Sequence, residues 1–319
     1  MYFAYYSSLL NGKGMVTEYR KALVYSKLVY TIVALVLLFL NFGLISIVVA
    51  NLMTPFVTRY FSQKFFFTTD LKSKLKGHKA SKEEKLQLIE IIWHNAKKLG
   101  LVYVGSFTIT KMGMFIAGLF LSLDSIASYG LMVQLVSLIA VISTTISTLY
   151  QPRLTSMRTG ASDRQLLFDF SYTVVIFKIL FIMGAILFIS FGNSILSWLG
   201  STTALPSLSI LILYCIVVFL ETNHSLFSSF LVTNNEIPFV KATLVAGTMI
   251  TIFTFLFLKF TDYGLMSVVL VPLVIQLAYN NWKWPYVVCS SFKINYLQFN
   301  FIGIKSLRIQ LSKISIKDK

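Results

Sequence analysis

The chain has 319 residues, of which 56% are hydrophobic and only 13% are charged, with a formal net charge of +16. Soluble domains carry roughly 25% charged residues, so this composition excludes a water-soluble fold. The apolar runs are continuous and lack the alternating polar positions of a membrane β-barrel, whereas an isolated helix satisfies its own backbone groups in lipid. The sequence therefore predicts an all-α integral membrane protein.

Eight segments are long and apolar enough to cross a hydrocarbon core, which takes roughly 20 residues of helix. They are residues 21–41, 42–58, 99–122, 126–150, 171–191, 205–233, 239–259 and 264–281.

Lys and Arg residues lie almost entirely on every second connection between these segments. Of the 28 basic residues, all but Lys111, Lys178 and Lys259 follow this register, and the intervening connections carry none. A basic patch that binds nucleic acid would not keep this register. By the positive-inside rule, both termini are expected in the cytoplasm, as in a multi-pass protein of the bacterial cytoplasmic (inner) membrane.

One long connection divides the chain. It opens after the second segment and is rich in Lys, and Ser81 with Glu84 predicts a capping box from which a helix continues into the third segment. The apolar stripe of this helix indicates either a helix on the membrane surface or one packed on the protein. The expected organisation is the end of a first helical bundle (1–58), a basic cytoplasmic linker (59–98), a complete six-helix bundle (99–282) and a basic cytoplasmic tail (283–319).

The sequence also contains an internal repeat. Residues 42–49, FGLISIVV, lie 221 positions before YGLMSVVL at 263–270, and Ser7-Ser8-Leu9-Leu10 lies 221 positions before SSFL at 228–231. Lys21-Ala22 matches Lys241-Ala242 after a one-residue shift. Helices one and two therefore correspond to helices seven and eight, so the repeating unit has six helices. On this alignment Met1 falls within a span, and the first three helices and most of a fourth of the first unit are expected to be missing.

Two six-helix units joined by a cytoplasmic linker are the architecture of the MATE-like exporter superfamily, and several segments resemble its polysaccharide branch, the O-unit flippases. The segments that carry this resemblance are FIAGLFLSLDSIASY at 115–129, Pro152-Arg153-Leu154, NNEIPFVKA at 234–242 and QLAYNNWKWP at 276–285.

The resemblance implies that the protein moves an undecaprenyl-diphosphate-linked oligosaccharide across the membrane by alternating access, for O-antigen, lipopolysaccharide or another surface polysaccharide. The expected partners are this lipid-linked substrate, the bilayer and other polysaccharide-assembly proteins. Many relatives carry an acidic residue early in their seventh helix, where this chain has Gly113. The coupling role of that acid therefore does not transfer.

Polar residues deep in a span are the candidates for substrate binding. A charge at the centre of a span costs roughly 2.5 to 3.5 kcal/mol to insert into the bilayer, so such residues normally face the interior of the bundle. Lys111 either binds the diphosphate or forms a buried ion pair. Glu221 and His224 lie on one helix face and either couple protons, bond sugar hydroxyls or make polar packing contacts, and Asn223 is a further candidate for substrate binding in the same span. We expect Lys111 and Glu221 to face one polar cavity, with His224 on the Glu221 face.

Three further residues are weaker candidates for contact with substrate. Lys178 lies about two turns into its span, from where its side chain can snorkel to the surface. Gln134 and Gln276 are polar residues within other spans.

The sequence predicts no cofactor, no metal site and no enzyme, because it contains no zinc-spaced His or Cys residues, phosphate-binding loop or nucleophile elbow. Three alternatives to a flippase stay open. They are a cation-coupled drug exporter of the same superfamily, a membrane polysaccharide polymerase and an inactive fragment.

Overall fold

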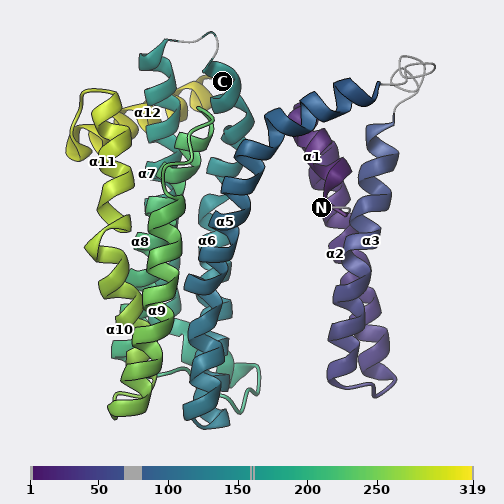
Figure 1. The fold of residues 1–319 in the computed structure, drawn as a ribbon. Helices are drawn as coiled ribbons and strands as arrows, with labels where there is room; N and C mark the ends of the chain where they lie inside the picture. The colour runs from purple at the N-terminus through teal and green to yellow at the C-terminus, as the bar shows by residue number, and fades with distance from the viewer. Residues whose placement is uncertain (1–2, 68–80, 159, 161, 318–319) are drawn as a thin grey trace. The chain divides into compact units, whose positions relative to one another are not determined.

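The computed structural model describes residues 3–67, 81–158, 160 and 162–317, and within these ranges the regular structure is entirely helical. The chain divides into two compact units, Met1–Lys85 and Leu86–Lys319, which are described separately below. The helices (Figure 1) are α1 (Tyr5–Gly12), α2 (Val16–Phe39), α3 (Leu44–Phe66), α5 (Lys82–Phe120), α6 (Leu123–Met157), α7 (Asp163–Trp198), α8 (Leu208–Val232), α9 (Val240–Phe260), α10 (Leu265–Ala278), α11 (Asn280–Ser291) and α12 (Tyr296–Lys317).

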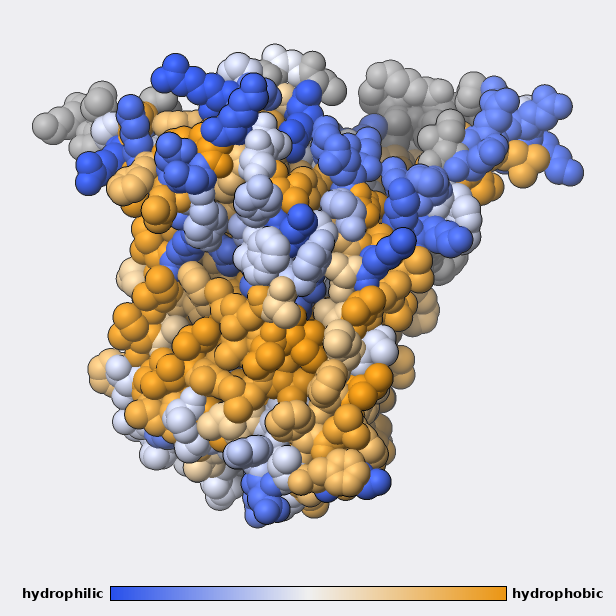
Figure 2. Space-filling view, turned by 60° about the vertical axis from the view of Figure 1, so that its left-hand side comes forward, coloured by the Kyte–Doolittle hydropathy of each residue, from blue (hydrophilic) through white to orange (hydrophobic). Residues whose placement is uncertain are grey.

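Eight helical stretches among the described residues have the length and composition to cross a membrane, which confirms the prediction of a multi-pass all-α membrane protein. The face drawn in Figure 2 shows the expected surface, with a broad hydrophobic zone between hydrophilic ends. Several helices are longer than predicted, as with Leu123–Met157 against 126–150 and Asp163–Trp198 against 171–191. Helix α3 continues beyond residue 58 to Phe66, and the last stretch runs from Leu265 to Ser291 as two helices.

Helix α5 begins at the predicted capping box. The backbone N–H of Ser81 donates to Glu84 Oε2 at 2.8 Å, and the N–H of Glu84 donates to Ser81 Oγ at 3.1 Å. The helix then runs without interruption to Phe120. The prediction that the linker helix continues into the third span is therefore confirmed.

Helices α2 and α3 of the smaller unit pack through small residues. Ala22, Ser26 and Ala50 are fully buried, so the two backbones approach closely, as is common where helices meet in membranes. The Ser26 hydroxyl donates to the carbonyl of Thr54 at 3.0 Å and accepts from Thr58 Oγ1 at 2.8 Å. These bonds hold the two helices in register.

The larger unit has an aromatic core that extends into its last helix. Phe170 of α7, Phe227 of α8 and Phe299 of α12 are buried, and their ring centroids lie 5.1 to 5.4 Å apart. At Gly303 of α12, an added Cβ would lie 2.5 Å from the carbonyl oxygen of Ser171, so α12 rests directly on α7. The predicted tail therefore contains a helix that is packed on the bundle.

Helices α5 and α9 also meet through glycines. A Cβ added to Gly247 would lie 3.0 Å from the carbonyl oxygen of Gly105, and a Cβ added to Gly105 would lie 2.9 Å from a methyl group of Thr243. This close approach places the apolar face around Ile109 against Ala246.

The last membrane stretch is interrupted at Tyr279, between α10 and α11. The backbone of Tyr279 has φ −145° and ψ −61°, far from the helical φ of about −63°. Residues 278 to 280 therefore mark a break in a stretch that is otherwise helical.

The repeat predicted from the sequence is visible in the local backbone. Gly43 (φ 55°, ψ −133°) precedes α3 and Gly264 (φ 52°, ψ −129°) precedes α10, 221 positions later. Gly14 and Asn235, separated by the same offset, both have positive φ, of 73° and 58°. The buried positions of α2 and α9 coincide partly at this offset, since Ala22 matches Thr243 and Ser26 matches Gly247, whereas buried Ala34 matches exposed Phe255. The turns support an offset of 221, and the one-residue shift at Lys21 stays a prediction.

Candidate functional site

The larger unit encloses a cavity of about 470 Å³, which we call the central cavity. Six helices contribute to it, α5, α6, α8, α9, α10 and α11. Its polar lining residues are Ser106, Thr110, Lys111, Ser137, Tyr214, Glu221, Thr222, His224, Ser225, Ser228, Thr243, Gln276, Asn280 and Trp284. Cavities of this volume are the size of small-molecule sites, and a polar lining within apolar helices is unusual enough to indicate a function.

Four of the residues predicted to contact substrate meet in this cavity, and Gln276 of α10 is one of them. Lys111 of α5 and Glu221 and His224 of α8 all line it, so the prediction that they share one polar cavity is confirmed. Within the described part of the chain, Lys111 and Glu221 form no direct ion pair with each other. Both side chains line the cavity, and their contact with substrate stays a prediction.

A chain of hydrogen bonds forms the wall of the cavity next to the break at Tyr279. Trp284 Nε1 donates to Asn280 Oδ1 at 3.1 Å, and Asn280 Nδ2 donates to Gln276 Oε1 at 2.7 Å. His224 Nδ1 lies 2.9 Å from Asn281 Oδ1. The polar groups of α10 and α11 thus satisfy one another and hold the broken helix to α8.

A second, smaller cavity of about 240 Å³ lies among α6, α7 and α8. Most of its lining side chains carry hydroxyl or amide groups, namely Thr144, Ser147, Thr148, Gln151, Thr173, Thr222, Ser225, Ser229 and Thr233. Thr222 and Ser225 line both cavities, so one stretch of α8 has polar groups on two sides.

The sequence analysis missed this hydroxyl-lined surface, although a signal for it exists. Residues 144, 147, 148 and 151 follow the spacing of one helix face, and three of them are Thr or Ser within an apolar span. A search for polar stripes, rather than for charged residues, would have found it.

Two other predicted substrate residues bond to α12 instead. The ammonium group of Lys178 donates to the hydroxyl of Tyr296 at 2.8 Å and to Asn300 Oδ1 at 2.6 Å, and it also lies 4.4 Å from the centre of the Tyr296 ring. The Tyr296 hydroxyl in turn donates to Asn223 Oδ1 at 3.2 Å. Lys178 and Asn223 therefore bond to the last helix and do not line the central cavity. Gln134 does not line this cavity either, and its side chain is exposed on α6.

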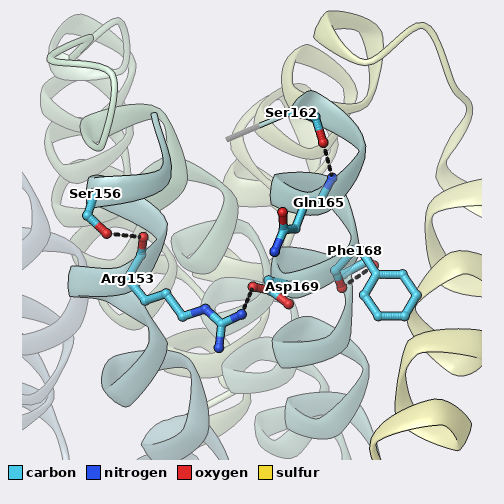
Figure 3. Close-up of polar contacts among 7 residues, drawn as sticks. Arg153, Ser156, Ser162, Gln165, Phe168 and Asp169 are labelled. Carbon is cyan, nitrogen blue, oxygen red and sulfur yellow. Dashed lines mark hydrogen bonds and ion pairs between the residues drawn. The ribbon is translucent and has the colours of Figure 1, made fainter. Parts of the chain in front are cut away.

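One buried carboxylate that the sequence analysis did not single out joins α6 to α7. Asp169 is only 4% exposed, and its Oδ2 lies 2.8 Å from a guanidinium nitrogen of Arg153 (Figure 3). Since an unpaired charge is costly to bury, Arg153 is needed to keep Asp169 in the core. The pair is a structural tie between the two helices.

We call the end of the larger unit that carries Arg153, Arg158 and Lys241 the basic end. Arg158 Nε donates to Thr233 Oγ1 at 3.1 Å, so the ends of α6 and α8 meet here. The Arg158 guanidinium also lies 4.3 Å from the centre of the Phe230 ring, and burial lowers the pKa of this guanidinium from its ordinary value. An arginine stays charged under such conditions.

The central cavity is lined by a lysine, a carboxylate, an imidazole and many hydroxyl and amide groups. Such a set can bind a molecule that is both anionic and rich in hydroxyls. The described residues contain no cluster of three or more His, Cys, Asp or Glu side chains that could hold a metal. Comparison of the chain with family models, with curated proteins and with solved structures found no match.

Proposed function

We propose that the protein is a membrane flippase that moves a polyprenyl-diphosphate-linked oligosaccharide between leaflets by alternating access. The central cavity carries this proposal. Lys111 supplies a positive charge for the diphosphate, while Ser, Thr, Asn and Gln side chains supply donors and acceptors for sugar hydroxyls. The resemblance of the sequence to MATE-like exporters points to the same substrate class, in a bacterial cytoplasmic membrane with both termini in the cytoplasm.

The proposal has a direct test in proteoliposomes that contain the 319-residue chain and a fluorescent oligosaccharide linked to polyprenyl diphosphate. A membrane-impermeant quencher reaches only the outer leaflet, so lipid movement appears as additional quenching with time. Quenching that does not exceed that of protein-free liposomes would reject the proposal.

The charge of Lys111 provides the sharper version of this test. We expect Lys111→Ala to lower the rate about tenfold or more, because a charge-assisted bond to the diphosphate is lost, and Lys111→Arg to retain most of it. Lys259→Ala is the matched control, since Lys259 lies in the last turn of α9 and contacts only phenylalanine rings in the described structure. Equal loss in the Ala and Arg variants would show that the charge does not contact the substrate.

The carboxylate of Glu221 in the same cavity favours a second candidate, a cation-coupled drug exporter. The same proteoliposomes separate the two candidates. Movement of a cationic dye that depends on Glu221, without movement of the lipid-linked oligosaccharide, would support the exporter and reject the flippase.

A further inference from the structure

An apolar groove of about 690 Å³ lies between α9 and the broken helix α10–α11. Ala242, Val245, Ala246 and Met249 line it from α9, and Val274, Ile275, Ala278 and Tyr279 line it from the other side. Val245, Met249 and Val274 are 57%, 42% and 62% exposed. Because α9 and α10 are membrane-spanning by length and composition, such exposed apolar side chains face hydrocarbon.

The groove contains a residue, Ala246, that is much smaller than the residue 221 positions earlier. Its counterpart in the smaller unit lies between α2 and α3, where Tyr25 occupies the position that Ala246 has in α9. The Tyr25 ring packs against Phe61, with centroids 4.9 Å apart, and against Phe65 at 6.3 Å. Tyr25 therefore packs against aromatic rings of α3 in the first hairpin, whereas Ala246 lines the groove in the second.

The groove and the central cavity share a wall. Asn280 and Trp284 line both, and the hydrogen bond between them closes that wall. The wall belongs to the first turns of α11, directly after the helix break at Tyr279. Movement of these two side chains would therefore join an apolar groove to a polar cavity.

A cation stands at the end of the groove. Lys241, in the first turn of α9, lines it and has no ion-pair partner in the described part of the chain. A lysine near a membrane surface attracts lipid phosphate by about 1 kcal/mol. The groove thus combines a positive head position with an apolar trench, which matches a lipid with a phosphate head.

We infer that the groove holds the hydrocarbon chain of the polyprenyl phosphate lipid while its phosphate lies at Lys241, and that the Asn280–Trp284 wall is the lateral entrance through which the head reaches the central cavity. The inference rests on the proposed function, because it assigns the tail of the same substrate. It explains how a polar head enters a cavity inside the bundle while the tail stays in hydrocarbon.

The test measures binding alone, in nanodiscs that hold the full chain and a polyprenyl phosphate with a photoreactive group in its tail. Cross-links are expected on peptides that contain Val245, Met249 and Val274. Ala278→Trp should remove most of the cross-linking because the indole occupies the groove. Leu277→Trp is the matched control, since Leu277 is the adjacent exposed residue of α10 and does not line the groove.

The phosphate position is tested with a second pair of variants. Lys241→Gln should weaken binding of the polyprenyl phosphate about fivefold and leave binding of the uncharged polyprenol unchanged. Lys259→Gln, at the other end of α9, should change neither. The melting temperature of each variant checks that the fold is retained.

Three results would overturn the inference. They are cross-links outside the groove, equal cross-linking in Ala278→Trp and Leu277→Trp, and equally strong competition by phosphatidylglycerol, which would make the groove a general lipid surface. A chain that binds the probe in the groove but moves no lipid-linked oligosaccharide would reject the proposed function and keep the groove. A chain that moves this lipid, with Ala278→Trp unaffected, would reject the groove alone.

Discussion

The first hairpin, α2 with α3, and its counterpart, α9 with α10, share one backbone plan but differ in their second helix. In both, a glycine with φ near 50° and ψ near −130° begins the second helix, and a serine two residues into it is buried. Helix α3 then continues past Pro55 to Phe66 as one helix, whereas α10 stops at Ala278 and α11 begins after Tyr279.

The difference in continuity coincides with a difference in chemistry. Gln276, Asn280 and Trp284 line the central cavity, and the residues 221 positions earlier are Pro55, Arg59 and Gln63. The two hairpins share the glycine turn that begins their second helix, but they do not share the residues that line the cavity in the larger unit. The repeat therefore specifies the hairpin, and residues that differ between the two copies after the first turn line the candidate site.

The largest expected effect comes from the hydrogen-bonded wall. Asn280→Ala leaves Trp284 Nε1 and Gln276 Oε1 unpaired, which should cost about 2–4 kcal/mol of stability in the larger unit. In the first hairpin, Thr58→Val removes one bond to Ser26 and should cost only about 1 kcal/mol. Denaturation followed by intrinsic fluorescence in detergent gives both values, and similar losses would contradict the contrast drawn between the hairpins.

An intermediate effect is expected at the paired glycines. Gly43→Ala and Gly264→Ala each force a Cβ into a backbone conformation that L residues rarely adopt, at about 1–3 kcal/mol. The space around each added Cβ is open or at van der Waals distance, so the backbone alone sets this cost. The same denaturation measurement should therefore give equal losses of stability for the two variants. Clearly unequal losses would show that the two turns are not equivalent.

The smallest effect is expected from exchanging Gly14 and Asn235, which hold equivalent positive-φ turns. Asn is the residue after Gly that best tolerates this conformation, so Asn235→Gly and Gly14→Asn should each change stability by less than about 1 kcal/mol. Gly14→Val is the contrasting variant and should cost more, because a β-branched residue is strained at positive φ. A large loss in Gly14→Asn would indicate that the two turns are not equivalent.

Sequence patterns predicted the helical spans because each span needs only a long apolar run, and the capping box at Ser81 predicted the start of α5. The shared cavity of Lys111 and Glu221 followed from the cost of placing either charge in lipid. The break at Tyr279 could not be predicted in this way. Proline is the usual sequence signal for a helix break, yet Pro55 and Pro152 lie inside continuous helices, so this signal does not locate breaks in this chain. The bond that ties this region to α8, between His224 Nδ1 and Asn281 Oδ1, joins residues 57 positions apart, and a contact of that kind leaves no local signal in the sequence.

The packing of α12 was also beyond the sequence, for a different reason. Its basic residues predicted a cytoplasmic tail, but Gly303 and Phe299 fit against α7 and α8. Lys178 then finds its partners on α12 rather than in a cavity. Contacts between residues more than 100 positions apart leave no periodic pattern in the chain.

The two cysteines provide a practical means of determining the orientation of the protein. Cys215 and Cys289 are both free and buried, so a maleimide should find little to modify in the natural chain. A single cysteine added at Ser201, in the connection between α7 and α8, should react with an impermeant maleimide on intact cells, whereas one added at Arg164 should react only after the membrane is opened. The reverse pattern would place the basic end outside the cell. Single cysteines can therefore be added to the natural chain directly, without first replacing Cys215 and Cys289.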